Sequence, residues 1–190
     1  NTMNTVLKTL LALTATALGL QAQAAPYQSI VPAKSSVTFS YKQMGVAMDG
    51  RFKKFAAQVN FDPAKAEQAN ASFEVDLASV DAGSSEADQE VVTKSWFNAA
   101  AFPKASFVAK QIKQTAPNQY EVQGTLSIKG LSRDVKFPMK HTAQGKDGLL
   151  TGSFTLKRAD YTIGEGMWAK FDVVANDIQV NFSLATALSK

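Results

Sequence analysis

Eight segments of the chain alternate apolar and polar residues with a period of two. In the first of them Val37, Phe39 and Tyr41 share one parity, and polar residues separate them. Because successive side chains of a strand point to opposite faces, each segment predicts a half-buried β-strand with one apolar face. The predicted strands cover residues 37–41, 55–61, 71–77, 105–112, 120–128, 135–139, 150–156 and 178–184.

Most connections between these segments are short and contain turn residues. Asp62-Pro63 ends the second segment, Lys129-Gly130 follows the fifth, and Lys146-Asp147-Gly148 lies between the sixth and the seventh. Short turns of this kind join antiparallel neighbours. No linker-like stretch and no internal repeat divides residues 25–190, so we expect a single domain there.

Two connections are long. The alternation stops between residues 78 and 104, where Ser84 or Ser85 is placed to cap a short helix over residues 86–95 with acidic residues in its first turn. The second long connection, residues 158–177, is rich in aromatic residues and glycine. We interpret it as an ordered loop or an irregular strand.

Eight antiparallel strands either stack as two sheets or close into a barrel. Closure removes the exposed edge strands that proline otherwise protects, and here only Pro138 interrupts a predicted strand. The pattern therefore favours an all-β fold, an eight-stranded antiparallel β-barrel with one short helix.

The interior of such a barrel is either filled by side chains or holds one small ligand. Small residues such as Ala57, Ala71, Ala109, Gly124 and Gly152 share the apolar face with several phenylalanines. They either accommodate large neighbours or leave an elongated apolar cavity. Nearly all inward positions are uncharged, so an occupant would have to be apolar, because an unpaired polar group costs roughly 1–3 kcal/mol there.

The N-terminal residues do not follow this pattern. Lys8, an apolar stretch over residues 10–20 and small residues up to Ala24 resemble a secretory signal, so we expect residues 1–24 to be a signal peptide cleaved after Ala24. A membrane anchor is the alternative, but the stretch is shorter than the roughly 20 residues that span a bilayer. Residues 1–2 precede the first methionine and are interpreted as an expression remnant or a mis-set start.

Composition excludes several classes of function. The chain has no cysteine, which excludes disulfides, thiol chemistry and Cys-ligated metal. A net charge of +4 with scattered basic residues does not indicate a nucleic-acid surface. The densest basic cluster, Arg51 with Lys53 and Lys54, is either a solvated strand edge or a mouth that attracts an anionic head group.

Nine short motifs, in order along residues 39–164, resemble those of the YceI family, the lipocalin-like polyisoprenoid-binding proteins of bacteria. The residues that carry the resemblance are Phe39–Gly45, Asp49–Phe52, Val59–Asp62, Ala78–Gly83, Trp96-Phe97, Phe102–Phe107, Gly124–Gly130, Arg133–Val135 and Arg158–Gly164.

The resemblance implies a lipocalin-like barrel, closed at one end, that holds a long isoprenoid chain. Members are exported, and some are linked with quinone-like or prenyl-phosphate lipids or with hydrophobic antibiotics. Many members carry a histidine where this chain has Gln43. An isoprenoid of about 40 carbons, at about −0.3 kcal/mol per heavy atom, would bind with about −12 kcal/mol, close to nanomolar affinity.

The candidate tunnel residues are apolar or aromatic residues of the predicted strands and of the two long connections, and the head-group candidates are cationic or hydrogen-bonding residues expected near the mouth. The tunnel candidates are Phe39, Tyr41, Phe55, Phe61, Phe73, Phe97, Phe107, Phe154, Ile163 and Trp168. The head-group candidates are Gln43, Arg51, Lys53, Arg158 and Tyr161, with Lys129 and Arg133 as further cations.

Catalytic chemistry has little support. His141 is the only histidine, and a triad or metal site would have to include it. The acidic residues Asp81, Glu86, Asp88 and Glu90 fit a helix start and solvated turn better than a metal site. We therefore expect no metal and no cofactor.

The leading hypothesis is a periplasmic or secreted carrier that binds a polyisoprenoid, a prenyl phosphate, a quinone or another hydrophobic small molecule. It would act without catalysis, as a monomer or homodimer, with a transient membrane contact and no nucleic-acid partner. Two alternatives remain open. One is an enzyme that acts on an isoprenoid lipid through His141. The other is an interaction protein that presents residues 78–104 or 158–177 to a membrane complex.

Overall fold

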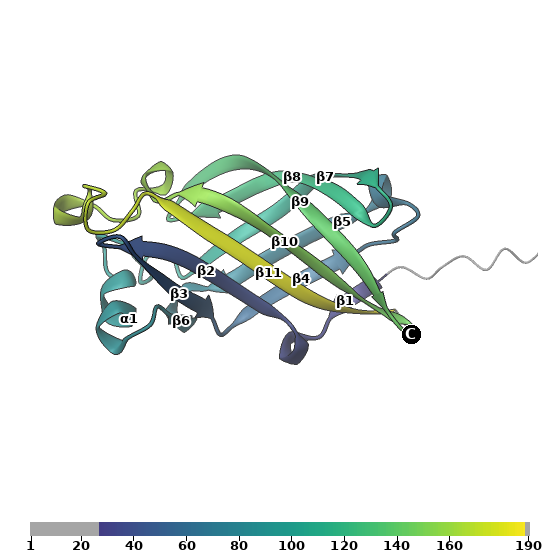
Figure 1. Cartoon of the computed structure of the whole chain (residues 1–190), viewed down its shortest axis with the longest axis horizontal. Coiled ribbons are helices and arrows are strands. Elements are labelled where there is room, and N and C mark those ends of the chain that lie inside the picture. Colours follow the sequence, from purple (N-terminus) through teal and green to yellow (C-terminus); the bar gives the residue numbers. More distant parts are fainter. Residues whose placement is uncertain (1–26, 189–190) are drawn as a thin grey trace, which may run out of the picture.

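The computed structural model describes residues 27–188, which form one curled antiparallel sheet with a short helix at one end (Figure 1). All eight predicted strands are present, several of them longer than expected, and the predicted signal peptide, residues 1–24, lies outside the described residues. The strands are β1 (Tyr27–Ile30), β2 (Ser36–Gln43), β3 (Val46–Phe52), β4 (Phe55–Asn60), β5 (Asn70–Asp76), β6 (Val80–Asp81), β7 (Lys104–Ala116), β8 (Gln119–Ile128), β9 (Leu131–Gln144), β10 (Asp147–Lys157) and β11 (Asp177–Leu188).

The sheet curls back onto its own beginning. Its strand order is β4-β5-β7-β8-β9-β10-β11-β2-β3-β6, with β1 beside β11. The two ends of this order belong to one bent hairpin. Along the chain, β3 leads into β4 and β5 leads into β6. Across the hairpin, β4 pairs with β5, and β3 pairs with β6. If β3 and β4 count as one strand and β5 and β6 as another, eight antiparallel strands form the wall, as the alternation of apolar and polar residues predicted. That alternation did not predict the segments β1, β3 and β6.

A buried serine holds the bend in this hairpin. Between β3 and β4 the regular ladder is interrupted at Lys53 and Lys54. The backbone N–H of Lys54 donates to the Ser79 hydroxyl at 2.9 Å, and the N–H of Lys53 donates to the Ser79 carbonyl at 3.1 Å. Ser79 lies in the 3-10 turn η3 (Leu77–Ser79) between β5 and β6. The bend therefore keeps its backbone groups hydrogen-bonded, as buried backbone requires.

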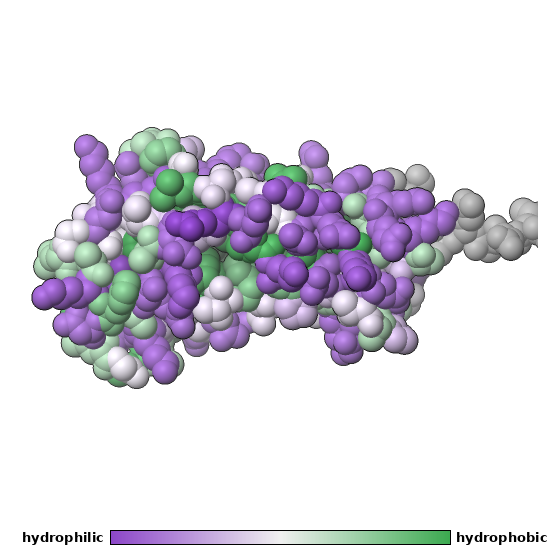
Figure 2. Space-filling view, turned by 90° about the horizontal axis from the view of Figure 1, so that it is seen from above, coloured by the Kyte–Doolittle hydropathy of each residue, from purple (hydrophilic) through white to green (hydrophobic). Residues whose placement is uncertain are grey.

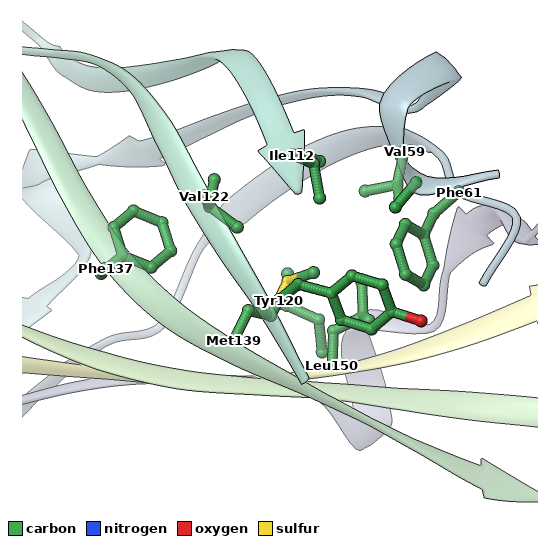
Figure 3. Packing of buried hydrophobic residues seen from close by; sticks show 10 residues of the cluster. Val59, Phe61, Ile112, Tyr120, Val122, Phe137, Met139 and Leu150 are labelled. Atoms are coloured by element: carbon green, nitrogen blue, oxygen red, sulfur yellow. The ribbon is translucent and has the colours of Figure 1, made fainter. Parts of the chain in front are cut away.

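Aromatic packing closes the end of the barrel opposite α1. Side chains from β4, β7, β8, β9 and β10 meet there (Figure 3). The rings of Phe61 and Tyr120 lie edge to face at 5.1 Å, and the Tyr120 hydroxyl donates to the Pro63 carbonyl at 3.0 Å. Because the tyrosine ring is buried and its hydroxyl is satisfied, it forms a stable floor for the barrel.

The predicted helix is present but shorter than expected. Helix α1 covers Ser85–Val91, and the Ser84 hydroxyl caps it by accepting from the Ala87 N–H at 3.1 Å. We expected it to continue to residue 95. It ends earlier because two valines and Thr93 follow one another, which lowers helix propensity, and because the Thr93 hydroxyl bonds to the Glu90 carbonyl at 2.7 Å.

The loop over residues 158–177 is ordered around a buried arginine. It contains the 3-10 turns η4 (Arg158–Tyr161) and η5 (Gly166–Trp168). The Arg158 guanidinium is 1% exposed and donates to six backbone carbonyls between 2.7 and 3.2 Å. Their residues are Ile163, Gly164, Trp168, Lys170, Val174 and Ala175. The Arg158 side chain thus supplies hydrogen bonds to loop carbonyls that have no partner in a helix or a sheet, and so orders the loop.

Replacing Arg158 by methionine should strongly destabilise the protein, because it leaves several loop carbonyls without donors. We expect the free energy of unfolding to fall by about 3 kcal/mol or more, measured by urea denaturation. The exposed Arg133 provides the matched control, and R133M should change stability by less than about 0.5 kcal/mol. An R158M variant as stable as R133M would contradict this role.

His141 should make stability depend on pH in a definite direction. Burial lowers the pKa of its imidazole below the ordinary value. The unfolded chain then binds a proton more readily than the folded chain, so stability should fall as pH drops through about 6.5 and level off below the folded pKa. Thermal unfolding of the protein and of H141L should diverge in this window. Parallel curves would show that the only histidine of the chain does not contribute.

Candidate binding site

An elongated cavity of about 570 Å³ occupies the barrel interior. Its walls are almost entirely apolar, and phenylalanine rings project into it from several strands. Nine of the ten tunnel candidates line it: Phe39, Tyr41, Phe61, Phe73, Phe97, Phe107, Phe154, Ile163 and Trp168. Phe55 is the exception, because its ring stacks against that of Phe73 at a centroid distance of 5.8 Å instead of lining the cavity.

The small inward residues play both of the roles that the sequence left open. At Gly124 a Cβ would come within 2.6 Å of the Phe107 ring, and at Gly152 it would overlap the Phe182 ring, so these glycines accommodate large neighbours. Ala57 and Ala71, by contrast, line the cavity. The void therefore exists where alanines face it, while the glycines let aromatic rings lie flat against the wall.

The cavity reaches solvent at the end that carries α1. Ser84 and Glu86 line the cavity and are exposed, which marks the mouth. Gln43 at the end of β2 and Glu90 in α1 also line it there. The described polar side chains at the mouth thus include two carboxylates, one amide and one hydroxyl.

A hydrogen bond joins the two long connections across this mouth. The indole Nε1 of Trp168 donates to Glu90 Oε1 at 3.0 Å, and both side chains line the cavity. The Trp168 ring also packs against Trp96, which lies beyond the end of α1, at a centroid distance of 5.5 Å. These contacts position α1 and the loop over residues 158–177 as the border of the mouth.

Most of the predicted head-group residues lie away from the cavity. Arg51 is exposed and pairs with Asp81 at 3.6 Å, and Lys53 is exposed at the hairpin bend. Neither lines the cavity, nor does Tyr161, which is 2% exposed and whose pKa is raised by burial. The further cations Lys129 and Arg133 do not line it either. The sequence therefore did not show which loops and cations surround the mouth.

Only Gln43 and Arg158 of the head-group candidates line the cavity. Every nitrogen of the Arg158 guanidinium already donates to backbone carbonyls, so it offers no donor to a ligand. This correction has a simple cause, since a sequence does not show which backbone carbonyls surround a cation. The Tyr41 hydroxyl is likewise engaged, as it donates to the Ala82 carbonyl at 2.7 Å. Burial and the nearby Asp88 carboxylate raise the pKa of Tyr41.

Several lining residues were not selected from the sequence. Phe137 and Phe182 had the correct parity, and their rings meet at 5.6 Å, so parity alone could have found them. Phe52 lies in β3, which the alternation did not reveal. Glu90 and Val91 reach the cavity through the placement of α1, and no local sequence signal indicates that.

His141 lies away from the cavity. Its ring packs at 5.7 Å from that of Phe61 at the closed end, and it does not line the void. Within residues 27–188, no three histidine, cysteine or carboxylate side chains cluster so that they could hold a metal ion. No helix among the described residues is long and apolar enough to cross a membrane.

Solved structures with this architecture are known. The chain superposes on BcnA of Burkholderia cenocepacia with a TM-score of 0.80 and 39% identity, covering 83% of this chain and 99% of that one. The YceI protein of Campylobacter jejuni gives a TM-score of 0.67 and 25% identity, over 74% and 84% of the two chains. A polyisoprenoid-binding domain of Saccharophagus degradans, at 16% identity, shares the fold with a TM-score of 0.70, over 86% and 99% of the chains.

Sequence comparison gives the same result. A UPF0312 protein of Photorhabdus laumondii is 30% identical over 74% of this chain and 75% of its own length. One of Azotobacter vinelandii is 31% identical, over 58% of both chains. The family described as YceI-like domain matches residues 28–186. The fold, the axial cavity and these matches together show that this chain belongs to the YceI-like domain family.

Proposed function

We propose that this protein binds a long apolar lipid of the polyisoprenoid type inside its barrel and acts as a carrier or sequestering module. The observation that carries the proposal is the apolar cavity of about 570 Å³ along the barrel axis. Its volume lies within the roughly 300–1,000 Å³ of small-molecule sites, and its lining would penalise a polar occupant. The fold shared with a polyisoprenoid-binding domain supports the same class of ligand.

The polar end of the ligand is uncharged in this proposal. Among residues 27–188, Arg158 is the only cation that lines the cavity, and its donors are already used, whereas Glu86 and Glu90 line the mouth. A prenyl phosphate would bring its negative charge close to these carboxylates without a cation whose donors are free to bind it. A quinone or an alcohol could instead hydrogen-bond to the Gln43 amide or the Ser84 hydroxyl. We therefore favour a quinone-type lipid over a prenyl phosphate.

Binding without catalysis fits the position of the titratable groups. The only histidine of the chain lies outside the cavity lining, so an enzyme built on His141 would lack contact with a ligand in the barrel. We also propose that the protein acts in the periplasm or the medium, because residues 1–24 resemble a secretory signal. No metal or cofactor is required for this function, and monomer and homodimer are equally compatible with an axial cavity.

Filling the cavity should abolish lipid capture. Ala57 lines the cavity, and Ala56 on the same strand is exposed, so A57F and A56F add the same ring to opposite faces of β4. We expect A57F to bind a long-chain isoprenoid quinone at least about tenfold more weakly, because the ring occupies ligand space. Trp96 and Trp168 both line the cavity, so quenching of their fluorescence by the quinone reports binding.

The controls separate a loss of binding from a loss of fold. A56F and H141A should both bind the quinone like the unchanged protein, and far-ultraviolet circular dichroism should show that A57F remains folded. Equal binding by folded A57F and A56F would refute an axial site. Loss of binding in a folded H141A would instead favour a role for the histidine.

The mouth should select against a charged head group. We compare a prenyl phosphate with a prenyl alcohol of the same chain length, using tryptophan fluorescence. The phosphate should bind about five- to tenfold more weakly, because each exposed charge interaction contributes up to about 1 kcal/mol. The double variant E86Q/E90Q should remove most of this difference. Tighter binding of the phosphate to the unchanged protein would contradict the uncharged head group.

A further inference from the structure

Exposed large apolar side chains are concentrated at one end of the described barrel. Within residues 27–188, six of the seven lie at the end that carries α1 and the mouth, while the seventh, Val108, lies on the wall in β7 (Figure 1). Figure 2 shows apolar groups among hydrophilic ones at this left-hand end, and further apolar groups along the middle of the face. The six residues are Met44, Val46, Phe102, Leu131, Met167 and Phe171.

One group of these side chains borders the mouth directly. The Met44 N–H donates to the Val173 carbonyl at 2.7 Å, which places the turn between β2 and β3 beside the loop that carries Met167 and Phe171. Met44 and Met167 are 71% and 83% exposed. Their chain neighbours Gln43 and Trp168 both line the cavity. The exposed methionines therefore lie at the rim, one residue from the lining.

A second group lies on the other side of the same loop. The Phe102 ring packs against Gly130 in the turn between β8 and β9, and Leu131 follows that turn. The Lys129 ammonium in this turn donates to the Thr162 carbonyl at 2.7 Å. The turn is thereby attached to the loop over residues 158–177.

We propose that this end of the protein docks onto a lipid bilayer, with Met44, Val46, Met167 and Phe171 entering the interface around the mouth. The inference rests on the proposed function, since it supplies the surface from which an apolar ligand enters the cavity. A lipid that passes from a bilayer directly into the barrel avoids exposure of its apolar chain to water, which is unfavourable in proportion to the area exposed.

The form of the rim favours a bilayer over a protein partner. Its apolar side chains come from two adjacent turns at one end of the barrel and surround the opening, so all of them can enter a bilayer interface when that end faces it. Basic residues flank them: Lys42, Lys170 and Arg133 are exposed and have no ion-pair partner among the described residues. Such side chains extend toward lipid phosphates while their apolar stems cover the rim. Acidic residues such as Asp172 are also present, so apolar insertion, and not net charge, should dominate.

The test is flotation of the protein with vesicles of phosphatidylethanolamine and phosphatidylglycerol, and with vesicles of phosphatidylcholine alone. The variant M44S/V46T/M167S removes three apolar rim side chains that do not line the cavity. It should bind both kinds of vesicle at least about tenfold more weakly than the unchanged protein. Phe171 is left in place because its ring lies 5.0 Å from the Arg158 guanidinium and supports the loop.

V108T is the matched control, because it removes an exposed apolar side chain from the wall instead of the rim. It should float like the unchanged protein, and all variants share the same N-terminal segment, so the comparison isolates the rim. Quenching of tryptophan fluorescence by a decyl-chain quinone, measured without vesicles, checks that the cavity of each variant is intact.

The outcomes separate this inference from the function on which it rests. Loss of flotation only in the triple variant, with quinone binding retained, supports docking through the rim. Quinone binding without flotation of the unchanged protein overturns docking and favours a protein partner for the rim. Equal flotation of the triple variant, or binding only to anionic vesicles that salt abolishes, also overturns it. Rim-dependent flotation without quinone binding supports docking and counts against the proposed function.

Discussion

Eight strands that close on themselves enclose more space than their inward side chains fill, and the other features of this structure depend on that constraint. Aromatic rings pack along the wall and against one another, as Phe137 does against Phe154 at 5.1 Å. At the closed end Phe61 and Tyr120 meet and fill the barrel, whereas alanines leave the middle open. The interior therefore combines a packed floor, which stabilises the fold, with a void that apolar ligands can occupy.

The open end requires a different kind of stabilisation, because its loops have few regular hydrogen bonds. Arg158 supplies the donors that the loop over residues 158–177 lacks, and it does so without a carboxylate partner. The bond between Trp168 and Glu90 then connects this loop to α1. A residue that looked like a ligand-binding cation is thus a structural one, because its guanidinium donors are used by loop carbonyls and are not available to a ligand.

This arrangement separates apolar recognition from polar recognition. The barrel interior offers an almost entirely apolar surface. Polar side chains lie at the mouth, where Gln43, Ser84 and two glutamates line the cavity. Basic side chains such as Lys42 and Lys170 lie outside the mouth, beside exposed apolar residues of the rim. In the proposed function, a lipid would therefore meet basic and apolar groups at the rim first, and an acidic or amide environment only at the mouth.

The sequence by itself determined the all-β class, the eight wall strands and a serine cap at residue 84 or 85. It also identified six aromatic residues of the lining that lie on predicted strands, because strand parity decides which side chains face inward. Only the tertiary structure decided the bend between β3 and β4, the partners of Arg158 and the position of the mouth. These depend on contacts between residues far apart in the chain, such as Lys54 with Ser79 and Trp168 with Glu90. The alternation of apolar and polar residues carries no information about such contacts, because it depends only on which face of its own strand a residue occupies.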